Sequence, residues 1–316
     1  MTTYKELFGK AVKYLSTDPT DDIEGQIWYN STSGTFKTEL SLPDTWASGG
    51  NLSTARRHLA GAGTQTSALA FGGMPPTSNA TEEYNGSAWT GGGNLNNART
   101  YLGGCGIQTA ALATMGFTTG PSALVEEYDG STWTAGGAAP AANNFNAAGG
   151  IQTAAFSCGG ESDGTSTIEY NGSTWTSGGS MNQGKDRHAA CGTQTAGLAF
   201  GGESTPGLLT AAEEYDGTSW VAGGSLNTAK ANTSGCGTQT AASNFGGNTP
   251  SATGATELYD GTSWITSPAS LATARAALAG AGTQTAGLAF GGFSPVTGAT
   301  EEFTGAALTV KTITTS

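Results

Sequence analysis

A short string, Gly-(Thr/Ile)-Gln-Thr, recurs six times along the 316-residue chain at a nearly constant spacing. Its glutamines are Gln65, Gln108, Gln152, Gln194, Gln239 and Gln284, so successive copies lie 42 to 45 residues apart. A tryptophan series with the same period runs through Trp89, Trp133, Trp175, Trp220 and Trp264. Self-similarity at a period of roughly 20–50 residues is typical of repeat folds. Six units therefore extend from about Ser53 to Val310.

Each unit contains the signals of short strands joined by tight turns. Asn85-Gly86 separates two β-prone runs, and the same kind of dipeptide returns at Asp129-Gly130, Asn171-Gly172, Asp216-Gly217 and Asp260-Gly261. Such a dipeptide favours a two-residue hairpin, because a type I′ turn needs positive φ at both central residues. Four short strands in about 40–45 residues are typical of a propeller blade, and a ring of blades leaves no long exposed edge.

The hydrophobic residue, double glycine, tyrosine and tryptophan of each unit resemble the kelch repeat. Phe71-Gly72-Gly73, Tyr84 and Trp89 form one copy, and Phe200-Gly201-Gly202, Tyr215 and Trp220 form another. The second unit departs, with Thr114-Met115-Gly116 in place of Phe-Gly-Gly. The resemblance implies an all-β, six-bladed kelch-like β-propeller over residues 46–316. It implies little about activity, because propellers host enzymes, ligand binders and scaffolds.

Two segments compete to complete the last blade. Trp46 has the place of a fourth-strand tryptophan without a blade of its own before it, so residues from about Phe36 to Trp46 could join the last blade. The run from Ala307 to Ile313 could take the same place. The sequence leaves both alternatives open.

The composition excludes several classes of protein. Only 11% of residues are Asp, Glu, Lys or Arg, and the net charge of −12 opposes binding to nucleic acid through bulk electrostatics. No apolar run approaches the roughly 18 residues of a membrane span, so we expect no membrane insertion. The 51 glycines fit turns and the close approach of first strands near a common axis.

Basic and acidic residues recur at two fixed positions of the unit. Nine residues before each glutamine are Arg56, Arg99, Asn143, Lys185, Lys230 and Arg275, and two residues before each Tyr or Phe are Glu82, Glu126, Ile168, Glu213, Glu257 and Glu301. The bases could form an anion-binding ring at a channel mouth. The third unit, however, lacks both base and acid, as ion pairing predicts, because an unpaired buried charge is costly. We interpret the series as a ring of structural ion pairs.

One position varies among otherwise similar strands. Seven residues before the glutamine are His58, Tyr101, Phe145, Arg187, Asn232 and Ala277. In a propeller this position shares a face with the variable loops between second and third strands, and variable loops on a rigid scaffold usually carry binding residues. We predict a binding face that includes His58, Tyr101, Phe145, Arg187 and Asn232, with neutral drift as the alternative.

The sequence gives thin support for catalysis. The two histidines, His58 and His188, lie in non-adjacent units, and no recurring His, Cys or carboxylate cluster suggests a metal. Three of the four cysteines, Cys105, Cys191 and Cys236, share a position that also accepts Ala and Gly, which indicates packing. We expect no enzyme activity, no catalytic residues, no metal and no cofactor.

The N-terminal segment differs from the repeats. Residues 3–16 place Tyr4, Leu7, Phe8, Val12 and Leu15 at helical spacing and predict a short helix, while Ile27–Asn30 and Gly34–Phe36 predict a hairpin. Residues 1–45 therefore form a separate segment whose apolar stripe either docks on a partner or packs on its own propeller.

Residues 24–37, EGQIWYNSTSGTFK, resemble a segment near the start of tail and other virion proteins of marine tailed bacteriophages. The resemblance implies a non-enzymatic, tail-associated structural protein located in the phage particle. Its expected partners are other virion proteins, bound through the N-terminal segment, and a host-surface glycan, bound at the variable face. The alternative is a soluble bacterial kelch propeller that binds or degrades carbohydrate.

Overall fold

The structure, a computed structural model, describes residues 12–20, 25–161, 164–205 and 207–313. Every regular element in these ranges is a β-strand, which confirms the all-β prediction. No helix within them could span a membrane. The chain divides into two compact units, Trp46–Thr304 and the pair of segments Met1–Thr45 and Gly305–Ser316. The last twelve residues thus group with the N-terminal segment, where the sequence had assigned them to the repeats.

The larger unit contains six four-stranded sheets, consistent with a β-propeller-like class of fold. The first two sheets comprise Ala60–Thr64 (β5), Ser67–Phe71 (β6), Thr81–Tyr84 (β7) and Trp89–Gly91 (β8), then Gly103–Ile107 (β9), Ala110–Thr114 (β10), Val125–Tyr128 (β11) and Trp133–Ala135 (β12). The next two comprise Ala147–Ile151 (β13), Ala154–Cys158 (β14), Thr167–Tyr170 (β15) and Trp175–Ser177 (β16), then Ala189–Thr193 (β17), Ala196–Phe200 (β18), Ala212–Tyr215 (β21) and Trp220–Ala222 (β22).

The fifth sheet comprises Ser234–Thr238 (β23), Ala241–Phe245 (β24), Ala255–Tyr259 (β25) and Trp264–Ser270 (β26). The sixth comprises Ala279–Gly282 (β27), Ala286–Phe290 (β28), Thr300–Thr304 (β29) and Thr45–Ser48 (β4). The first three strands of each sheet pair antiparallel in chain order. A short ribbon, Glu203–Ser204 (β19) with Gly207–Leu208 (β20), lies between β18 and β21.

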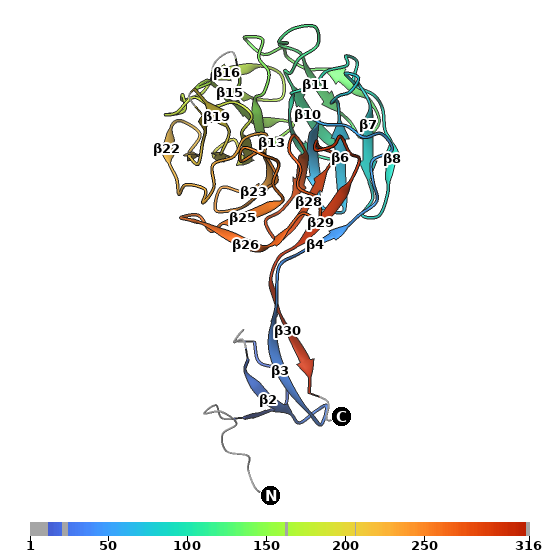
Figure 1. The fold of residues 1–316 in the computed structure, drawn as a ribbon, viewed down its shortest axis with the longest axis vertical. Coiled ribbons are helices and arrows are strands. Elements are labelled where there is room, and N and C mark those ends of the chain that lie inside the picture. The colour runs from blue at the N-terminus through green and yellow to red at the C-terminus, as the bar shows by residue number, and fades with distance from the viewer. Residues whose placement is uncertain (1–11, 21–24, 162–163, 206, 314–316) are drawn as a thin grey trace, which may run out of the picture. The chain divides into compact units, whose positions relative to one another are not determined.

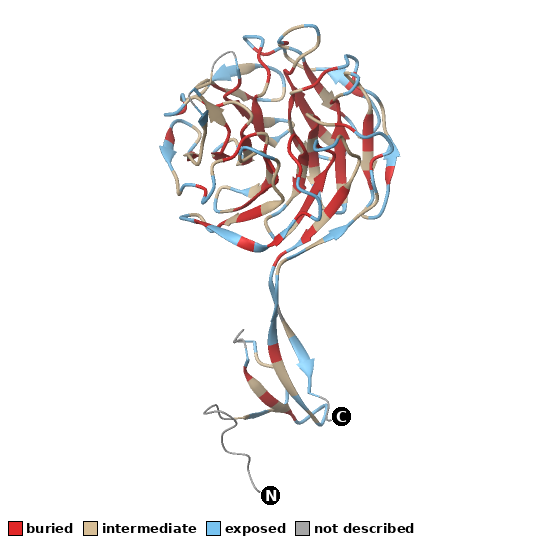
Figure 2. Ribbon diagram, viewed as in Figure 1, coloured by how far each residue is buried: buried red, intermediate tan, exposed pale blue. Residues whose placement is uncertain are grey.

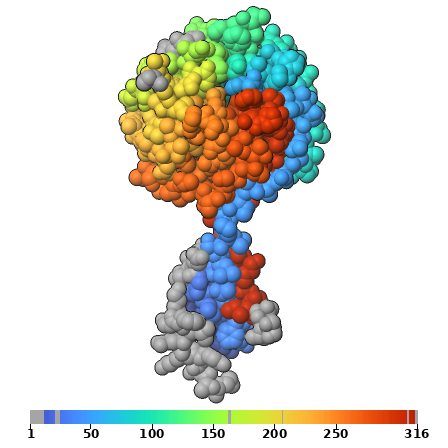
Figure 3. All heavy atoms as spheres, viewed as in Figure 1, coloured from blue at the N-terminus to red at the C-terminus, as the bar shows by residue number. Residues whose placement is uncertain are grey.

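The first strands of the six sheets surround a common axis. Each contacts the first strand of the next sheet, and β27 of the last sheet contacts β5 of the first, so the contacts form a closed cycle. A cavity of about 130 Å³ is lined by residues of all six first strands. Figure 1 shows outer strands such as β8, β22 and β26 at the periphery, and Figure 2 shows buried residues concentrated in the inner strands. In Figure 3 the colours follow chain order around this unit.

Glycine and phenylalanine are complementary between neighbouring sheets. A Cβ atom on Gly104 would lie 2.6 Å from Cζ of Phe71 in the preceding sheet, and Gly61, Gly235 and Gly280 face a phenylalanine in the same way. At the equivalent positions of the third and fourth sheets, Ala148 and Ala190 follow sheets that carry Thr114 and Cys158 in place of Phe. The small residues therefore match the size of the side chain that faces them.

The repeated glutamine joins each sheet to the one before it. Gln108 Nε2 donates to the backbone carbonyls of Ala68 at 2.9 Å and Tyr84 at 2.7 Å, which belong to the second and third strands of the preceding sheet. The other five glutamines make the equivalent pair of bonds, including Gln65, which bonds to Gly287 and Phe303 of the sixth sheet. Six copies of one side chain thus close the sheets into a cycle.

A tyrosine and a glutamate form a second contact between neighbouring sheets. Tyr128 Oη donates to Glu83 of the preceding sheet at 2.5 Å, and burial, together with Glu83, raises the pKa of Tyr128 to about 12. Four further pairs repeat the bond, namely Tyr84 with Glu302, Tyr170 with Glu127, Tyr215 with Glu169 and Tyr259 with Glu214. At the sixth junction both residues differ, since Phe303 follows a sheet that carries Leu258.

Strand β4 decides between the two segments that the sequence offered for the last sheet. Its Trp46 donates from Nε1 to Thr256 Oγ1 at 2.9 Å, and its ring packs against Phe245 and Phe303. The competing run, Ala307–Thr312 (β30), pairs instead with Thr35–Leu42 (β3) in the smaller unit. A strand that precedes the first repeat therefore completes the last sheet.

The smaller unit is one four-stranded sheet. Lys13–Leu15 (β1) pairs parallel with Ile27–Asn30 (β2), β2 forms a hairpin with β3, and β30 lies on the other side of β3. The prediction of a helix over residues 3–16 is wrong at 13–15, because ladder pairing with β2 and stacking of Tyr14 on Tyr29 override the local apolar spacing. Residues 3–11 lie outside the described residues. Asp18 accepts hydrogen bonds from Trp28, Asn30 and Lys37 on one face of this sheet.

Candidate recognition site

Six equivalent residues converge at one end of the axis of the larger unit. Each lies two residues before the first strand of its sheet, namely His58, Tyr101, Phe145, Arg187, Asn232 and Ala277. Together with the residues that follow them, they line a cavity of about 90 Å³, here called the axial mouth. The structure therefore brings together all five residues of the predicted binding face.

The backbone at these six positions is left-handed. Their φ values lie between 51° and 58°, although none of the six is glycine. This conformation costs a non-glycine residue about 1 kcal/mol or more, and it persists only where the surroundings hold it. Backbone hydrogen bonds join five of the six neighbouring pairs and supply that restraint, because Tyr101 N donates to His58 O, Phe145 N to Tyr101 O, Asn232 N to Arg187 O, Ala277 N to Asn232 O and His58 N to Ala277 O.

Three rings and a guanidinium group crowd one side of the axial mouth. The ring centroids of His58 and Tyr101 lie 4.4 Å apart, and those of Tyr101 and Phe145 lie 4.1 Å apart. The guanidinium carbon of Arg187 lies 4.1 Å from the centroid of Phe145, a cation–π contact. Arg187 also pairs with Asp186 and Glu203, so two carboxylates balance its charge. The site therefore presents aromatic faces beside a compensated cation.

The two histidines and Cys158 near the axis have pKa values shifted toward their neutral forms. Burial, followed by the nearby charges of Arg57 and Arg187, lowers the pKa of His58 to about 3. Burial also lowers the pKa of His188 to about 3 and raises the pKa of the Cys158 thiol to about 12. Although Cys158 Sγ lies 3.5 Å from His188 Nε2, these directions oppose a thiolate–imidazolium pair. All four cysteines are free and buried, and among the described residues no group of three His, Cys, Asp or Glu side chains could hold a metal.

The residues just after the left-handed positions also line the axial mouth, and the sequence reasoning missed them. They are Leu59, Leu102, Asn146, His188, Thr233 and Leu278, all buried. Three consecutive units carry polar side chains here and the other three carry leucine, so one half of the channel wall is polar. Asn146 Nδ2, for example, donates to Thr114 Oγ1 at 3.0 Å and Ser157 Oγ at 2.9 Å. In the sequence, the change from leucine to polar residues in three consecutive units could have identified this position as part of the site.

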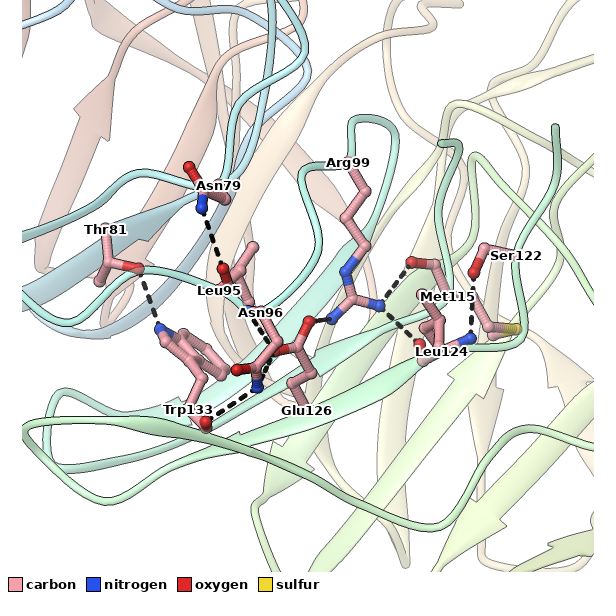
Figure 4. A network of polar contacts seen from close by, with 10 residues as sticks. All are labelled: Asn79, Thr81, Leu95, Asn96, Arg99, Met115, Ser122, Leu124, Glu126 and Trp133. Carbon is pink, nitrogen blue, oxygen red and sulfur yellow. Dashed lines mark hydrogen bonds and ion pairs between the residues drawn. The ribbon is translucent and has the colours of Figure 1, made fainter. Parts of the chain in front are cut away.

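In five of the six units, the Arg or Lys nine residues before the repeat glutamine lies against a glutamate, away from the axial mouth. Arg99 donates from Nη2 to Glu126 Oε1 at 2.9 Å and from Nη1 to the carbonyls of Met115 and Leu124 (Figure 4). The equivalent pairs are Arg56–Glu82 at 2.7 Å, Lys185–Glu213 at 3.0 Å, Lys230–Glu257 at 3.0 Å and Arg275–Glu301. The five basic side chains are at most 1% exposed, so they present no free positive charge to solvent.

Burial and pairing act in opposite directions on these charges. Burial lowers the pKa of Arg99, and Glu126 opposes that shift. Burial alone would raise the pKa of Glu213, but Lys185 and the amides of Asn182 outweigh it and leave the pKa lowered. Each pair is therefore a buried ion pair within its own sheet.

The five residues predicted to dock on a partner are only partly described. Tyr4, Leu7 and Phe8 lie outside the described residues. Val12 and Leu15 are half-buried, and the carbonyl of Leu15 accepts a hydrogen bond from Ser31 N at 2.8 Å. Leu15 thus belongs to the sheet of the smaller unit. Compared with known proteins, the chain matches no family model and no curated protein.

Proposed function

We propose that the larger unit is a six-bladed kelch-like β-propeller that serves as a non-enzymatic recognition module. Three features support the architecture: six four-stranded sheets, a closed cycle of first strands and a fourth strand donated from before the first repeat. The Phe-Gly-Gly, Tyr and Trp series of the repeat supports the kelch assignment.

The observation that carries the proposed function is the left-handed ring at the axial mouth. Six backbone positions share one left-handed conformation, and backbone hydrogen bonds join five of the six neighbouring pairs, yet the side chains differ in every unit. Such a scaffold allows the side chains to change without disturbing the fold, which is the arrangement that recognition sites use. The neutral imidazoles and protonated thiols around it favour binding over acid–base or nucleophilic chemistry.

The proposed ligand is a glycan on a host cell surface. Tyr101 and Phe145 offer aromatic surface to the apolar faces of sugar rings, and Asn232 offers an amide to their hydroxyl groups. Because the cavity itself holds only about 90 Å³, the glycan lies across the axial mouth and inserts at most a substituent. The protein carrying this site is a structural component of a phage particle, associated with the tail, whose residues 1–45 bind neighbouring virion proteins. That location is supported by the resemblance of residues 24–37 to phage virion proteins.

Binding of purified protein to a glycan array and to intact host cells tests the recognition step. We expect Tyr101→Ala and Phe145→Ala to weaken binding by roughly tenfold or more, as truncation of central aromatic anchors does. Val221→Ala, at an exposed position on β22, is the matched control and leaves binding unchanged. Equal binding by all four proteins would refute recognition at the axial mouth. Release of reducing sugars from a polysaccharide, abolished by substitution of His58 or His188, would instead assign the chain to the carbohydrate-degrading alternative.

Particle assembly tests the proposed location separately. Deletion of residues 1–24 leaves residues 46–304 with their full set of six sheets, so we expect a folded protein that no longer co-sediments with phage particles. A deletion variant that still joins the particle, or a wild-type chain absent from purified particles, would overturn the assignment to the virion.

A further inference from the structure

The third unit lacks a three-part polar contact that the other five units share. In those five, the glutamate forms an ion pair with the base and accepts a hydrogen bond from a backbone N–H three residues before the base. The backbone bonds are Ser53 N to Glu82, Asn96 N to Glu126, Asn182 N to Glu213, Asn227 N to Glu257 and Ala272 N to Glu301, at 2.6–2.7 Å. The contact fills the space between the ends of the second and third strands.

All three parts change together in the third unit. Asn143 stands in place of the base, Ile168 in place of the glutamate, and Pro140, which has no N–H, in place of the backbone donor. Asn143 Nδ2 donates to Gly159 O at 2.9 Å, the carbonyl equivalent to Gly72 O, which accepts a bond from Arg56 in the first unit. The joint change therefore removes side-chain volume without creating an unpaired charge.

The vacated space is a cavity of about 300 Å³. Met115, Pro140 and Ile168 give it an apolar wall, while Asn143, Ser157 and Ser166 contribute an amide and hydroxyl groups. No lining residue carries a charge. Ile168 is only partly buried, whereas the glutamates at its position in the other units are at most 4% exposed, so the cavity opens to solvent.

We propose that this cavity, here called the third-unit pocket, binds one neutral sugar ring. A volume of about 300 Å³ lies at the lower end of ligand pockets and suits one ring rather than a chain of sugars. An apolar wall facing hydroxyl and amide groups matches the two sides of a pyranose, and the absence of a countercharge disfavours a charged ligand. The site shares no lining residue with the axial mouth, so it does not depend on the function proposed there.

Titration with methyl glycosides, followed by NMR of 13C-methyl methionine, tests the proposal directly. Met115 lines the pocket, whereas Met74 lies in the first unit and serves as an internal control. We expect at least one neutral glycoside, from a panel of methyl glucosides, galactosides and mannosides at millimolar concentrations, to shift the Met115 signal and leave that of Met74 in place. A panel that moves neither signal overturns the proposal.

A filled pocket provides the decisive variant. The triple substitution Pro140→Asn, Asn143→Lys and Ile168→Glu installs the contact made by Asn182, Lys185 and Glu213 in the fourth unit. It should weaken glycoside binding by roughly tenfold or more, because the ion pair occupies the binding volume. Ile168→Trp, at a partly buried position that lines the cavity, is a second way to fill the pocket if the triple variant folds poorly.

Binding that persists in a folded, filled variant would also overturn the proposal. Tyr101→Ala and Phe145→Ala should leave the Met115 response intact. If these two variants lose binding to surface glycans while the Met115 titration is unchanged, the axial mouth and the third-unit pocket bind independently. A failure of the proposal at one site can then be told apart from a failure at the other.

Discussion

Trp133 donates its indole N–H to Thr81 Oγ1 of the preceding sheet at 2.9 Å, in a buried contact between neighbouring sheets (Figure 4). The same bond links Trp89 to Thr300, Trp220 to Thr167 and Trp46 to Thr256. Val125 occupies the threonine position before the third sheet, and Trp175 donates instead to Gly137 O. Ala212 occupies it before the fifth sheet, and the buried Nε1 of Trp264 has no acceptor among the described residues.

Ala212→Thr should therefore stabilise the protein. The added hydroxyl gives Trp264 the acceptor that four other tryptophans have, and satisfying a buried donor contributes about 1 kcal/mol. The free energy of unfolding, measured in denaturant, should rise by that amount. Thr81→Ala, which removes the acceptor from Trp133, is the matched reverse variant and should lower stability. An Ala212→Thr protein that is less stable than wild type would show that the site has no room for the hydroxyl.

Gly104→Ala should destabilise the protein by about 1–3 kcal/mol, because the new methyl group meets Phe71 at 2.6 Å. Combining it with Phe71→Cys recreates the pairing of Cys158 in the third unit with Ala190 in the fourth, and should recover part of the summed cost of the two single variants. A double-mutant cycle on unfolding free energies measures that recovery. Additive costs would mean that Gly104 and Phe71 do not constrain each other.

Tyr128→Phe and Glu83→Leu should each cost about 1 kcal/mol of unfolding free energy, since either removes one charge-assisted hydrogen bond. The double variant reproduces the natural Phe303 and Leu258 combination, so its cost should be smaller than the sum of the single costs. Circular dichroism at each temperature of a thermal scan would give the ranking of the four proteins. A double variant that loses as much stability as the two single variants together, or more, would contradict the contact between Tyr128 and Glu83.

The stability of the protein should fall in mild acid because of its histidines. The folded-state pKa of His188 is about 3, below its ordinary value of 6.5, so the unfolded chain binds a proton first as pH falls. The stability present above pH 6.5 is then lost as pH falls from 6.5 toward 3, by about 1.4 kcal/mol per pH unit for one such group.

His188→Asn introduces the residue type that the third unit has at this position, Asn146. It should reduce the pH dependence of the unfolding free energy by about one proton. His58 contributes in the same direction and remains in the variant. The comparison is made between pH 6.5 and 5, above the ordinary carboxylate range. Parallel stability curves for the two proteins would show that His188 titrates normally in the folded state.

The repeat spacing made the fold largely predictable. The period, the Asn-Gly and Asp-Gly turns and the double glycines place the strands of each unit, and the joint absence of Arg and Glu at Asn143 and Ile168 indicated their contact. The same kind of joint change, Leu258 with Phe303, could have revealed the Tyr–Glu contacts between sheets. Sequence comparison between units thus identifies contacts that one unit alone does not show.

Other features could not be predicted because they arise from the assembled cycle. The left-handed backbone at His58, Tyr101 and Phe145 depends on hydrogen bonds between units, and Tyr and Phe are not residue types that favour positive φ. The apolar spacing of residues 3–16 predicted a helix, whereas pairing of Lys13–Leu15 with β2 depends on a segment farther along the chain. The third-unit pocket required both the loss of the ion pair and the geometry of the surrounding strands.

The origin of β4 has a consequence for biosynthesis. Trp46 and its hydrogen-bond partner Thr256 are 210 positions apart, and the sheet that β4 completes is the last to be synthesised. During translation β4 therefore stays without its partner strand until the final unit has left the ribosome. A chain that stops early therefore keeps an exposed strand edge at each end, a state that invites proteolysis or aggregation. Only a chain that includes the sixth unit can therefore pair β4 and close the cycle of sheets.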